Sequence, residues 1–245
     1  MLVTGGAKRI GAAIARAFAE AGWHVVIHYG RSRDQAEALA AQLPSAEIVS
    51  CELDGWHEGP AMVADLARRL DDWRVLVNCA GVFDLDTAQD LEPGLFEAAM
   101  QVNAGTPARL AQQFLAHARS PHGRRVIHVT DQKLHNPNPD FFSYTMSKHA
   151  LSATIPMLSM ARNDPRDRIY GIAPGAILAS HDQTEAETEV SHRMNLLHRK
   201  TAPQDIAGAA LFLAGGWLVS GETVFVDSGQ HLLAQERDVL FLARQ

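Results

Sequence analysis

The chain has 245 residues, 47% of them hydrophobic, which is enough to bury a large core in one α/β domain. Its formal net charge of −6 argues against nucleic acid or an anionic membrane surface as the main partner. Cys51 and Cys79 are too few for a disulfide framework and indicate a reducing, cytoplasmic setting, and no apolar run is long enough to span a membrane.

Short β-like runs alternate with helical periodicity along the chain, which predicts βαβ units and a mostly parallel sheet. Strands are expected at residues 1–4, 24–29, 47–51, 75–78, 126–130, 168–172 and 223–226. Helices are expected at residues 10–21, 34–43, 60–70, 95–118, 144–162 and 204–214. The pattern predicts one Rossmann-type, doubly wound α/β domain over residues 1–245, with about seven strands and helices on both faces.

Three local features modify this outline. The first strand is short, which suggests that further residues precede Met1 in the natural protein. Pro156 should kink or shorten the helix in which it lies. Residues 178–201 are polar and irregular, and we expect a mobile lid over a site, with its histidines in a solvated loop. These histidines are His181, His192 and His198, and the chain shows no metal-ligand spacing.

A glycine-rich turn, T-G-G-A-K-R-I-G, runs from Thr4 to Gly11 between the first strand and the first helix. Glycines here let the backbone approach a pyrophosphate, which the helix N-terminus attracts. A plain turn capping the helix is the alternative. The motif resembles the T-G-x-x-x-G-x-G of short-chain dehydrogenases/reductases, with Arg9 in place of the middle glycine. The resemblance implies cofactor contacts at Gly5, Lys8, Arg9, Ile10 and Gly11.

The end of the second strand indicates which dinucleotide is bound. An acid there would hold the ribose 2′-hydroxyl of NAD, whereas arginine accommodates the 2′-phosphate of NADP. The segment reads I-H-Y-G-R-S-R and has no acid before Asp34. Arg31 offers a fork of donors to a phosphate, and Ser32 offers a hydroxyl. An exposed basic turn is the alternative, but together with the glycine turn we predict NADPH, with Tyr29 as a further contact.

Tyr144 and Lys148 are four residues apart on a predicted helix, so both side chains share one face. A phenol ionises near pH ~10, and an adjacent ammonium favours the phenolate. We therefore expect Lys148 to lower the pKa of Tyr144 and make it a usable acid. Asp131 lies thirteen positions upstream of Tyr144, at the end of an apolar strand.

Further segments match the same family, so the resemblance covers nearly the whole chain. It implies that Asn103 anchors a proton relay, and that the family's tetramers form through the fourth and fifth helices. V-D-S-G at residues 226–229 resembles the family's terminal V-D-G-G, and Asp54 competes with Glu52 for the adenine. The other implied cofactor contacts are Glu52, Leu53, Asn78, Ala80, Gly81, Lys148, Pro174 and Gly175.

Asp131 departs from the family, which usually has serine at this position to hydrogen-bond the substrate oxygen. A carboxylate would repel the oxyanion that forms when a ketone accepts hydride. It would instead favour a C=N bond whose nitrogen is protonated. Asp131 should also titrate jointly with Tyr144. A polar cap at the end of the strand is the alternative.

Arg9, H-Y-G-R-S, Asp131 and F-F-S-Y-T-M-S-K together resemble the pteridine reductase branch, which includes dihydromonapterin reductases and alternative dihydrofolate reductases. The resemblance implies NADPH-dependent reduction of a pterin or dihydropterin, such as dihydrofolate, dihydrobiopterin or dihydromonapterin, to the tetrahydro form. Arg9 and Phe83 would contact the substrate with Asp131 and Tyr144, although Phe83 could simply pack. The alternatives are a carbonyl or sugar-alcohol reductase and a non-enzymatic NADP(H) sensor. The lid and the end of the chain would decide which pterin is preferred.

Overall fold

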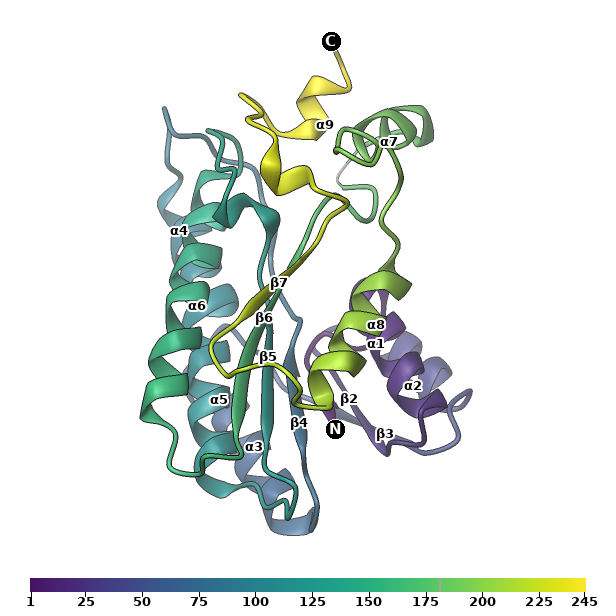
Figure 1. Ribbon diagram of the computed structural model, residues 1–245, viewed down its shortest axis with the longest axis vertical. Coiled ribbons are helices and arrows are strands. Elements are labelled where there is room, and N and C mark those ends of the chain that lie inside the picture. Colours follow the sequence, from purple (N-terminus) through teal and green to yellow (C-terminus); the bar gives the residue numbers. More distant parts are fainter. Residues whose placement is uncertain (181) are drawn as a thin grey trace.

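Seven parallel strands form the central sheet of the computed structural model, which describes residues 1–180 and 182–245 (Figure 1). Their order is β3-β2-β1-β4-β5-β6-β7, so the chain reverses direction across the sheet between β1 and β4. The strands are β1 (Leu2–Val3), β2 (Val25–Tyr29), β3 (Ala46–Ser50), β4 (Val75–Asn78), β5 (Arg125–Val129), β6 (Arg168–Pro174) and β7 (Thr223–Val226).

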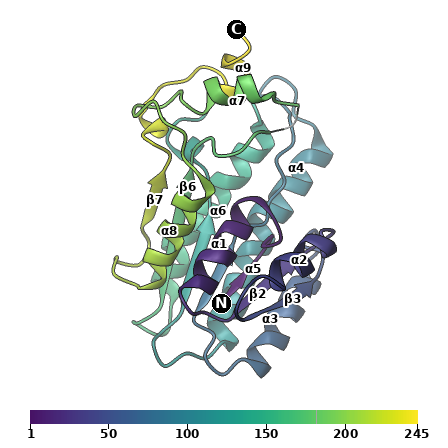
Figure 2. The same ribbon diagram turned by 90° about the vertical axis from the view of Figure 1, so that its right-hand side faces the viewer.

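Helices cover both faces of the sheet (Figures 1 and 2). One layer contains α1 (Arg9–Glu20), α2 (Arg33–Ala40) and α8 (Pro203–Ala214). The other contains α3 (Glu58–Arg69), α4 (Pro93–Met100), α5 (Thr106–His117) and α6 (Phe142–Ala161). Two short helices, α7 (Glu185–Ser191) and α9 (Val239–Leu242), lie together at one end of the molecule. Among the described residues, no helix is both long and apolar enough to cross a membrane.

The two faces of the sheet bury separate hydrophobic clusters, because successive side chains along a strand point to opposite faces. Ile27 packs with α1 and α8 on one side, whereas its neighbour Val26 belongs to the cluster under α3 and α5. Strands covered on both faces are apolar along their length, which explains the continuous apolar runs in the sequence. The second cluster contains Trp73, whose ring meets Phe114 edge-on at a centroid distance of 4.9 Å.

The predicted fold is confirmed, with all seven strands in the expected places and a sheet that is parallel throughout. The long helix expected at residues 95–118 is one helical run in three parts, because a π-helical segment, η1 (Gln101–Gly105), joins α4 to α5. The expectation that Pro156 shortens its helix is wrong, since α6 continues to Ala161, and the alternative expectation of a kink stays a prediction. Packing of α6 against β6, α4 and η1 holds the helix together despite the lost backbone donor.

The expectation for residues 178–201 needs two corrections. This segment is not irregular throughout, because it contains α7, whose capping box pairs the Thr184 and Glu187 side chains with each other's backbone N–H groups. His192 is buried rather than solvated, since it packs at the C-terminal end of α7. His198 is exposed as expected, and His181 lies outside the described residues.

We predict that Phe114→Ala lowers the free energy of unfolding by about 3–5 kcal/mol, because it opens a cavity beside Trp73 in a fully buried cluster. Phe212→Ala is the matched control, since the Phe212 side chain on α8 is 51% exposed, and its cost should stay below about 1 kcal/mol. Urea unfolding measures both values. Similar losses in the two variants would contradict the placement of Phe114 in the core.

Candidate active site

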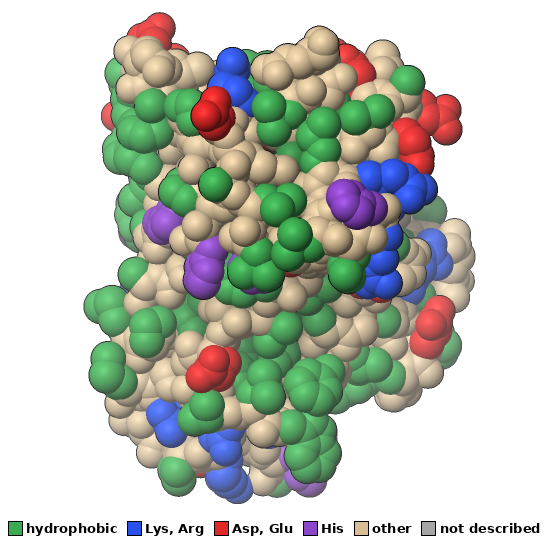
Figure 3. Space-filling view, turned by 45° about the horizontal axis from the view of Figure 1, so that its top comes forward, with side chains coloured by type: hydrophobic (Ala, Val, Ile, Leu, Met, Phe, Trp, Pro, Cys, Tyr) green, Lys and Arg blue, Asp and Glu red, His purple; other side chains and the backbone are tan. Residues whose placement is uncertain are grey.

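A cavity of about 450 Å³ opens at the carboxyl ends of the strands, beside the point where the strand order reverses. Ligands of open α/β sheets bind in this crevice. Its walls come from the glycine turn, the ends of β2, β4, β5 and β6, helix α6, residues 178–201 and the segment that ends in α9. We call residues 178–201 the lid after their predicted role. Hydrophobic side chains cover much of the molecular face at this end, with histidines across its middle (Figure 3). The predicted site residues that line the cavity are Gly5, Lys8, Arg9, Ile10, Gly11, Tyr29, Ser32, Ala80, Gly81, Phe83, Asp131, Tyr144, Lys148, Pro174 and Gly175.

The glycine turn places uncovered backbone at the cavity. Gly5 has a φ of +62°, and a Cβ atom there would lie only 2.9 Å from the Cα of Ala80. A side chain at Gly11 would run into the carbonyl oxygen of Gly5. Arg9 adopts a φ of 54°, the left-handed conformation for which the family uses glycine. Among the described residues, no side chain caps the N-terminus of α1, and the first turn of this helix has no acidic residue. The N-terminus of α1 therefore suits an anion.

His28 holds this turn in place, a role that the sequence analysis missed. The Gly5 N–H donates to His28 Nδ1 at 3.1 Å, and His28 Nε2 lies 3.1 Å from the carbonyl oxygen of Cys51. Burial lowers the pKa of His28, so the ring is neutral, with Nδ1 as acceptor and Nε2 as donor. One imidazole therefore ties the glycine turn to the end of β3. The H-Y-G-R-S motif contained this histidine, but only the pairing of β1, β2 and β3 reveals its partners.

Four predicted cofactor residues lie outside the cavity wall, namely Arg31, Glu52, Leu53 and Asn78. Arg31 is exposed beside Ser32, which does line the cavity. The backbone N–H of Glu52 donates to the Glu58 carboxylate, and Leu53 is buried. The roles assigned to Arg31, Glu52 and Leu53 therefore stay predictions.

Asn78 and Asn103 also lie behind the wall, where they hold its backbone. The Asn78 amide donates to the carbonyl oxygen of Pro107, and its nitrogen lies 3.2 Å from His128 Nδ1. Asn103 accepts from the Val82 N–H and donates to the Val82 carbonyl and the Ser147 hydroxyl. Asn103 therefore joins the loop after β4 to α6. Its proposed part in a proton relay stays a prediction.

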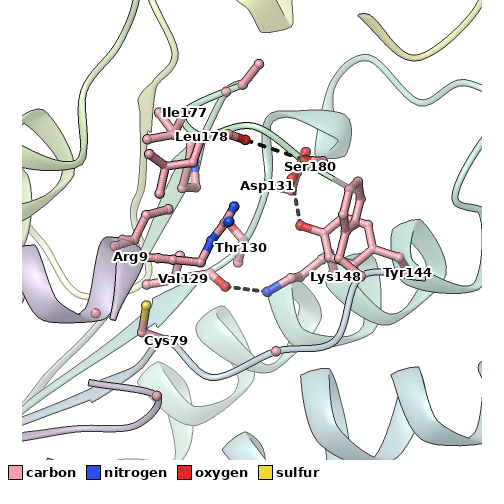
Figure 4. Close-up of a pocket in the computed structure, with 18 of the residues that line it drawn as sticks. Arg9, Cys79, Val129, Thr130, Asp131, Tyr144, Lys148, Ile177, Leu178 and Ser180 are labelled. Atoms are coloured by element: carbon pink, nitrogen blue, oxygen red, sulfur yellow. Dashed lines mark hydrogen bonds between the residues drawn. The ribbon is translucent and has the colours of Figure 1, made fainter. Parts of the chain in front are cut away.

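Asp131, Tyr144 and Lys148 meet in the cavity (Figure 4). The Tyr144 hydroxyl donates to Asp131 Oδ2 at 2.7 Å. The Lys148 ammonium donates to the carbonyl oxygen of Val129 at 2.8 Å and lies 5.6 Å from the centroid of the Tyr144 ring. The second carboxylate oxygen of Asp131 accepts from the backbone N–H of Lys133 at 2.9 Å. The end of β5 and the first turns of α6 thus form one polar centre.

The expectation that Lys148 lowers the pKa of Tyr144 is wrong. Burial raises this pKa well above its ordinary value, and the negative charge of Asp131 raises it further. Burial likewise raises the pKa of Asp131 and lowers that of Lys148. Desolvation disfavours every charged form in this centre and outweighs the attraction between Lys148 and the phenolate. Tyr144 consequently keeps its proton at neutral pH and can act as a donor.

The aromatic and basic side chains on the substrate side are already engaged. Phe83 stacks on Phe141 at a centroid distance of 4.0 Å and meets the Tyr144 ring edge-on at 4.6 Å, so the packing role is confirmed. A further role in stacking on a substrate stays a prediction. The Arg9 guanidinium points into the cavity (Figure 4). It donates through both terminal nitrogens to the carbonyl oxygen of Ala179, at 3.2 Å each.

Several side chains that line the cavity were not anticipated from the sequence. Lys133 follows Asp131 in the chain, His192 comes from the lid, and Asp238 and Leu240 come from the last segment. The T-x-x-E pattern at Thr184 could have located the lid helix. No local pattern marks the other residues, because they reach the site only through tertiary packing.

Comparisons with known proteins agree with the observed fold. A family model described as enoyl-(acyl carrier protein) reductase matches residues 5–231. The 7alpha-hydroxysteroid dehydrogenase of Escherichia coli K12 is 29% identical, over 93% of this chain and 92% of that protein. The FolM alternative dihydrofolate reductase 1 of Brucella suis, crystallised with NADP, superposes with a TM-score of 0.89 at 32% identity, over 96% and 95% of the two chains. The angucycline C-6 ketoreductase LanV with bound NADP superposes with a TM-score of 0.85 at 28% identity, over 95% of each chain.

The raised pKa of Asp131 predicts a pH dependence of stability. Above the ordinary value of 3.8, the folded protein still holds this proton after the unfolded chain has lost it, so the free energy of unfolding falls as pH rises towards the native pKa. Asp131→Asn removes this loss. Its stability relative to the parent should therefore increase as pH rises above about 4, until the native pKa of Asp131 is passed, measured by urea unfolding. A difference that shrinks with pH would contradict the burial of an ionisable carboxyl here.

Proposed function

The chain belongs to the short-chain dehydrogenase/reductase family of oxidoreductases, and from this premise we propose that it reduces a C=N bond in a pterin or dihydropterin with NADPH. The substrate class would be dihydrofolate, dihydrobiopterin or dihydromonapterin, converted to the tetrahydro form. Asp131 carries the proposal, because it puts a carboxylate where a reductase of ketones needs a neutral donor. The structural similarity to an alternative dihydrofolate reductase supports the same substrate class.

The cavity suits a dinucleotide phosphate. The uncapped N-terminus of α1 and the left-handed Arg9 present donors to an anion beside glycines that leave the backbone uncovered. Ser32 lines the neighbouring wall, and no acidic side chain lines the cavity at the end of β2 among the described residues. Gly5, Arg9, Ser32 and Lys148 would hold NADPH. Neighbours crystallised with NADP support this choice of cofactor.

The chemistry follows from the protonation of the catalytic centre. NADPH, when bound, supplies the hydride. The Asp131 carboxylate attracts a substrate whose C=N nitrogen is protonated, and its bond to Tyr144 fixes the phenol. The reduction adds one hydride to carbon and one proton to nitrogen. Where the substrate arrives with a neutral nitrogen, Tyr144, which retains its proton at neutral pH, can supply that proton before hydride transfer; a protonated Asp131 or a water is the alternative source. Lys148 is held against β5, where it balances part of the Asp131 charge.

A carbonyl reductase is the second candidate, and the ketoreductase among the structural neighbours favours it. Tyr144 could donate its proton to a ketone oxygen as readily as to a nitrogen. Asp131 separates the two functions, because its charge would raise the energy of an alkoxide-like transition state. A non-enzymatic NADP(H) sensor would not need the Tyr144–Asp131 bond.

One further prediction, the oligomeric state, rests on the family resemblance, and another, the cellular setting, rests on the cysteine content. We propose a homotetramer, and the exposed Met157 and Met160 on α6 support an intersubunit contact there. The cytoplasmic setting predicted from the cysteine content stays a prediction.

The decisive test follows NADPH oxidation with dihydrofolate, dihydrobiopterin, dihydromonapterin, a quinone and a panel of ketones. We expect turnover of at least one reduced pterin and little or none of the ketones. Asp131→Ser should lower the kcat/KM for the pterin by about 100-fold, the size of a typical acid–base contribution, and leave the affinity for NADPH unchanged. Rapid turnover of ketones alone, or unaltered pterin turnover in the variant, would contradict the proposal.

A further inference from the structure

Lys133 is a buried lysine on the cavity wall with no part in the chemistry described so far. Its side chain is 4% exposed, and it lies two residues after Asp131 in the short 3-10 helix η2 (Gln132–Leu134). Lysine is almost never buried to this extent unless it is paired, because removing an ammonium from water is costly. Its partners therefore show why the fold keeps it there.

The Lys133 ammonium is fully engaged. It lies 2.7 Å from Asp238 Oδ2 and donates to Asn138 Oδ1 and to the Asp140 carbonyl oxygen at 3.2 Å each. These contacts use all three donors of the ammonium. It also lies 5.0 Å from the centroid of the Phe141 ring. The charge is thus fixed in position rather than free to follow a ligand.

Asp238 is held just as firmly. Its Oδ1 accepts from the Leu240 N–H at 3.0 Å, which caps α9, and its own N–H donates to Asp140 Oδ2 at 2.8 Å. Arg237 Nε donates to both oxygens of the buried Asp140, at 2.8 and 3.0 Å. The segment that ends in α9 is therefore anchored to the loop before α6, with Asp238 against Lys133. A residue more than 100 positions away in the chain completes the charge pattern at η2.

Lys133 also acts on Asp131. Its backbone N–H donates to Asp131 Oδ1, while Tyr144 donates to the other oxygen. Burial raises the pKa of Asp131, and among the interactions that oppose burial the charge of Lys133 is the largest, ahead of Lys148. Lys133 is therefore linked to two carboxyl groups of the cavity wall, to Asp238 through its ammonium and to Asp131 through its backbone N–H and its charge.

We propose that Lys133 is a positioning residue that favours the carboxylate form of Asp131 against the effect of burial, and that Asp238 holds Lys133 in place and moderates its charge. The importance of this for catalysis rests on the proposed function, in which the Asp131 charge selects a protonated C=N substrate. The segment that ends in α9 thereby contributes to the electrostatics of the site as well as to its wall. Among the described residues, the titratable and charged groups that line this cavity with Asp131 include Arg9, Cys79, Lys133, Tyr144, Lys148, His192 and Asp238.

Substitutions of Lys133 and of Asp238 should shift the titration midpoint of the Asp131 carboxyl in opposite directions. Lys133→Met removes the positive charge that most opposes the effect of burial on Asp131. Asp131 should then bind its proton more tightly, and the midpoint of its titration should rise by about 1 pH unit or more. Asp238→Asn leaves the Lys133 ammonium without its counter-charge, so the midpoint should fall. A general disturbance of the site would not shift the Asp131 midpoints of the two variants in opposite directions. Lys200→Met, at an exposed lysine of the lid that does not line the cavity, should leave the midpoint unchanged.

Carbon-13 NMR of the full-length protein labelled at the aspartate carboxyl carbon measures this midpoint, with Asp131→Asn identifying the signal. The titration needs neither substrate nor cofactor. An unchanged midpoint in a folded Lys133→Met variant would overturn the proposal. If that variant does not fold, Asp238→Asn provides the test, and an unchanged or raised midpoint there would overturn it equally.

A second readout separates this inference from the proposed function. If the Asp131 carboxylate is the reactive form, the acidic limb of the kcat/KM profile should move with the NMR midpoint in each variant. Shifted NMR midpoints with unmoved pH profiles would leave the role of Lys133 intact and contradict the role of Asp131 in substrate selection. Unshifted midpoints would reject the role of Lys133 whatever the activity.

Discussion

A carboxyl and a phenol share one partly buried hydrogen bond at the end of β5, and the chemistry of the site depends on how their charges are compensated. Desolvation favours the neutral form of Asp131 and of Tyr144, so an ionised carboxylate persists only where cations and N–H groups surround it. The backbone N–H of Lys133 and the ammonium groups of Lys133 and Lys148 meet this need. In the function we propose, the ionised carboxylate makes a negative site beside a proton donor, an arrangement that would suit a cationic nitrogen better than an oxyanion.

The parallel sheet brings these groups together because all its strands end at the same edge. The reversal of strand order beside β1 opens a crevice there, and the glycine turn, fixed by His28, lines one side of it. Asp131 follows β5, while Tyr144 and Lys148 lie on the same face of α6, so two adjacent elements hold the reactive groups. The outer wall comes from α7 and α9, whose segments Arg244 joins through its ion pairs with Asp182 and Glu187. The strand β5 and the helix α6 thus position the polar side chains, and the segments of α7 and α9 form the outer wall of the cavity.

Much of this architecture was predictable from local pattern. Apolar β-branched runs located the strands, and the spacing of Tyr144 and Lys148 located the catalytic face. What escaped prediction depends on burial and on distant contacts. The direction of the Tyr144 pKa shift required knowing how deeply the phenol is buried, and the pairing of Lys133 with Asp238 joins residues that no local spacing relates. The lid helix is different, because its capping box was present in the sequence.

The most direct test compares two flat ligands of one shape that bind to the NADP-loaded protein, a cyclic amidinium and its neutral lactam counterpart. Isothermal titration calorimetry at neutral pH gives both affinities. An ionised Asp131 predicts that the cation binds more tightly by about tenfold or more, equivalent to roughly 1.4 kcal/mol, and that Asp131→Asn abolishes the preference. Equal affinities in the parent protein, or a preference for the lactam, would contradict the central claim that this site is built for a positively charged nitrogen.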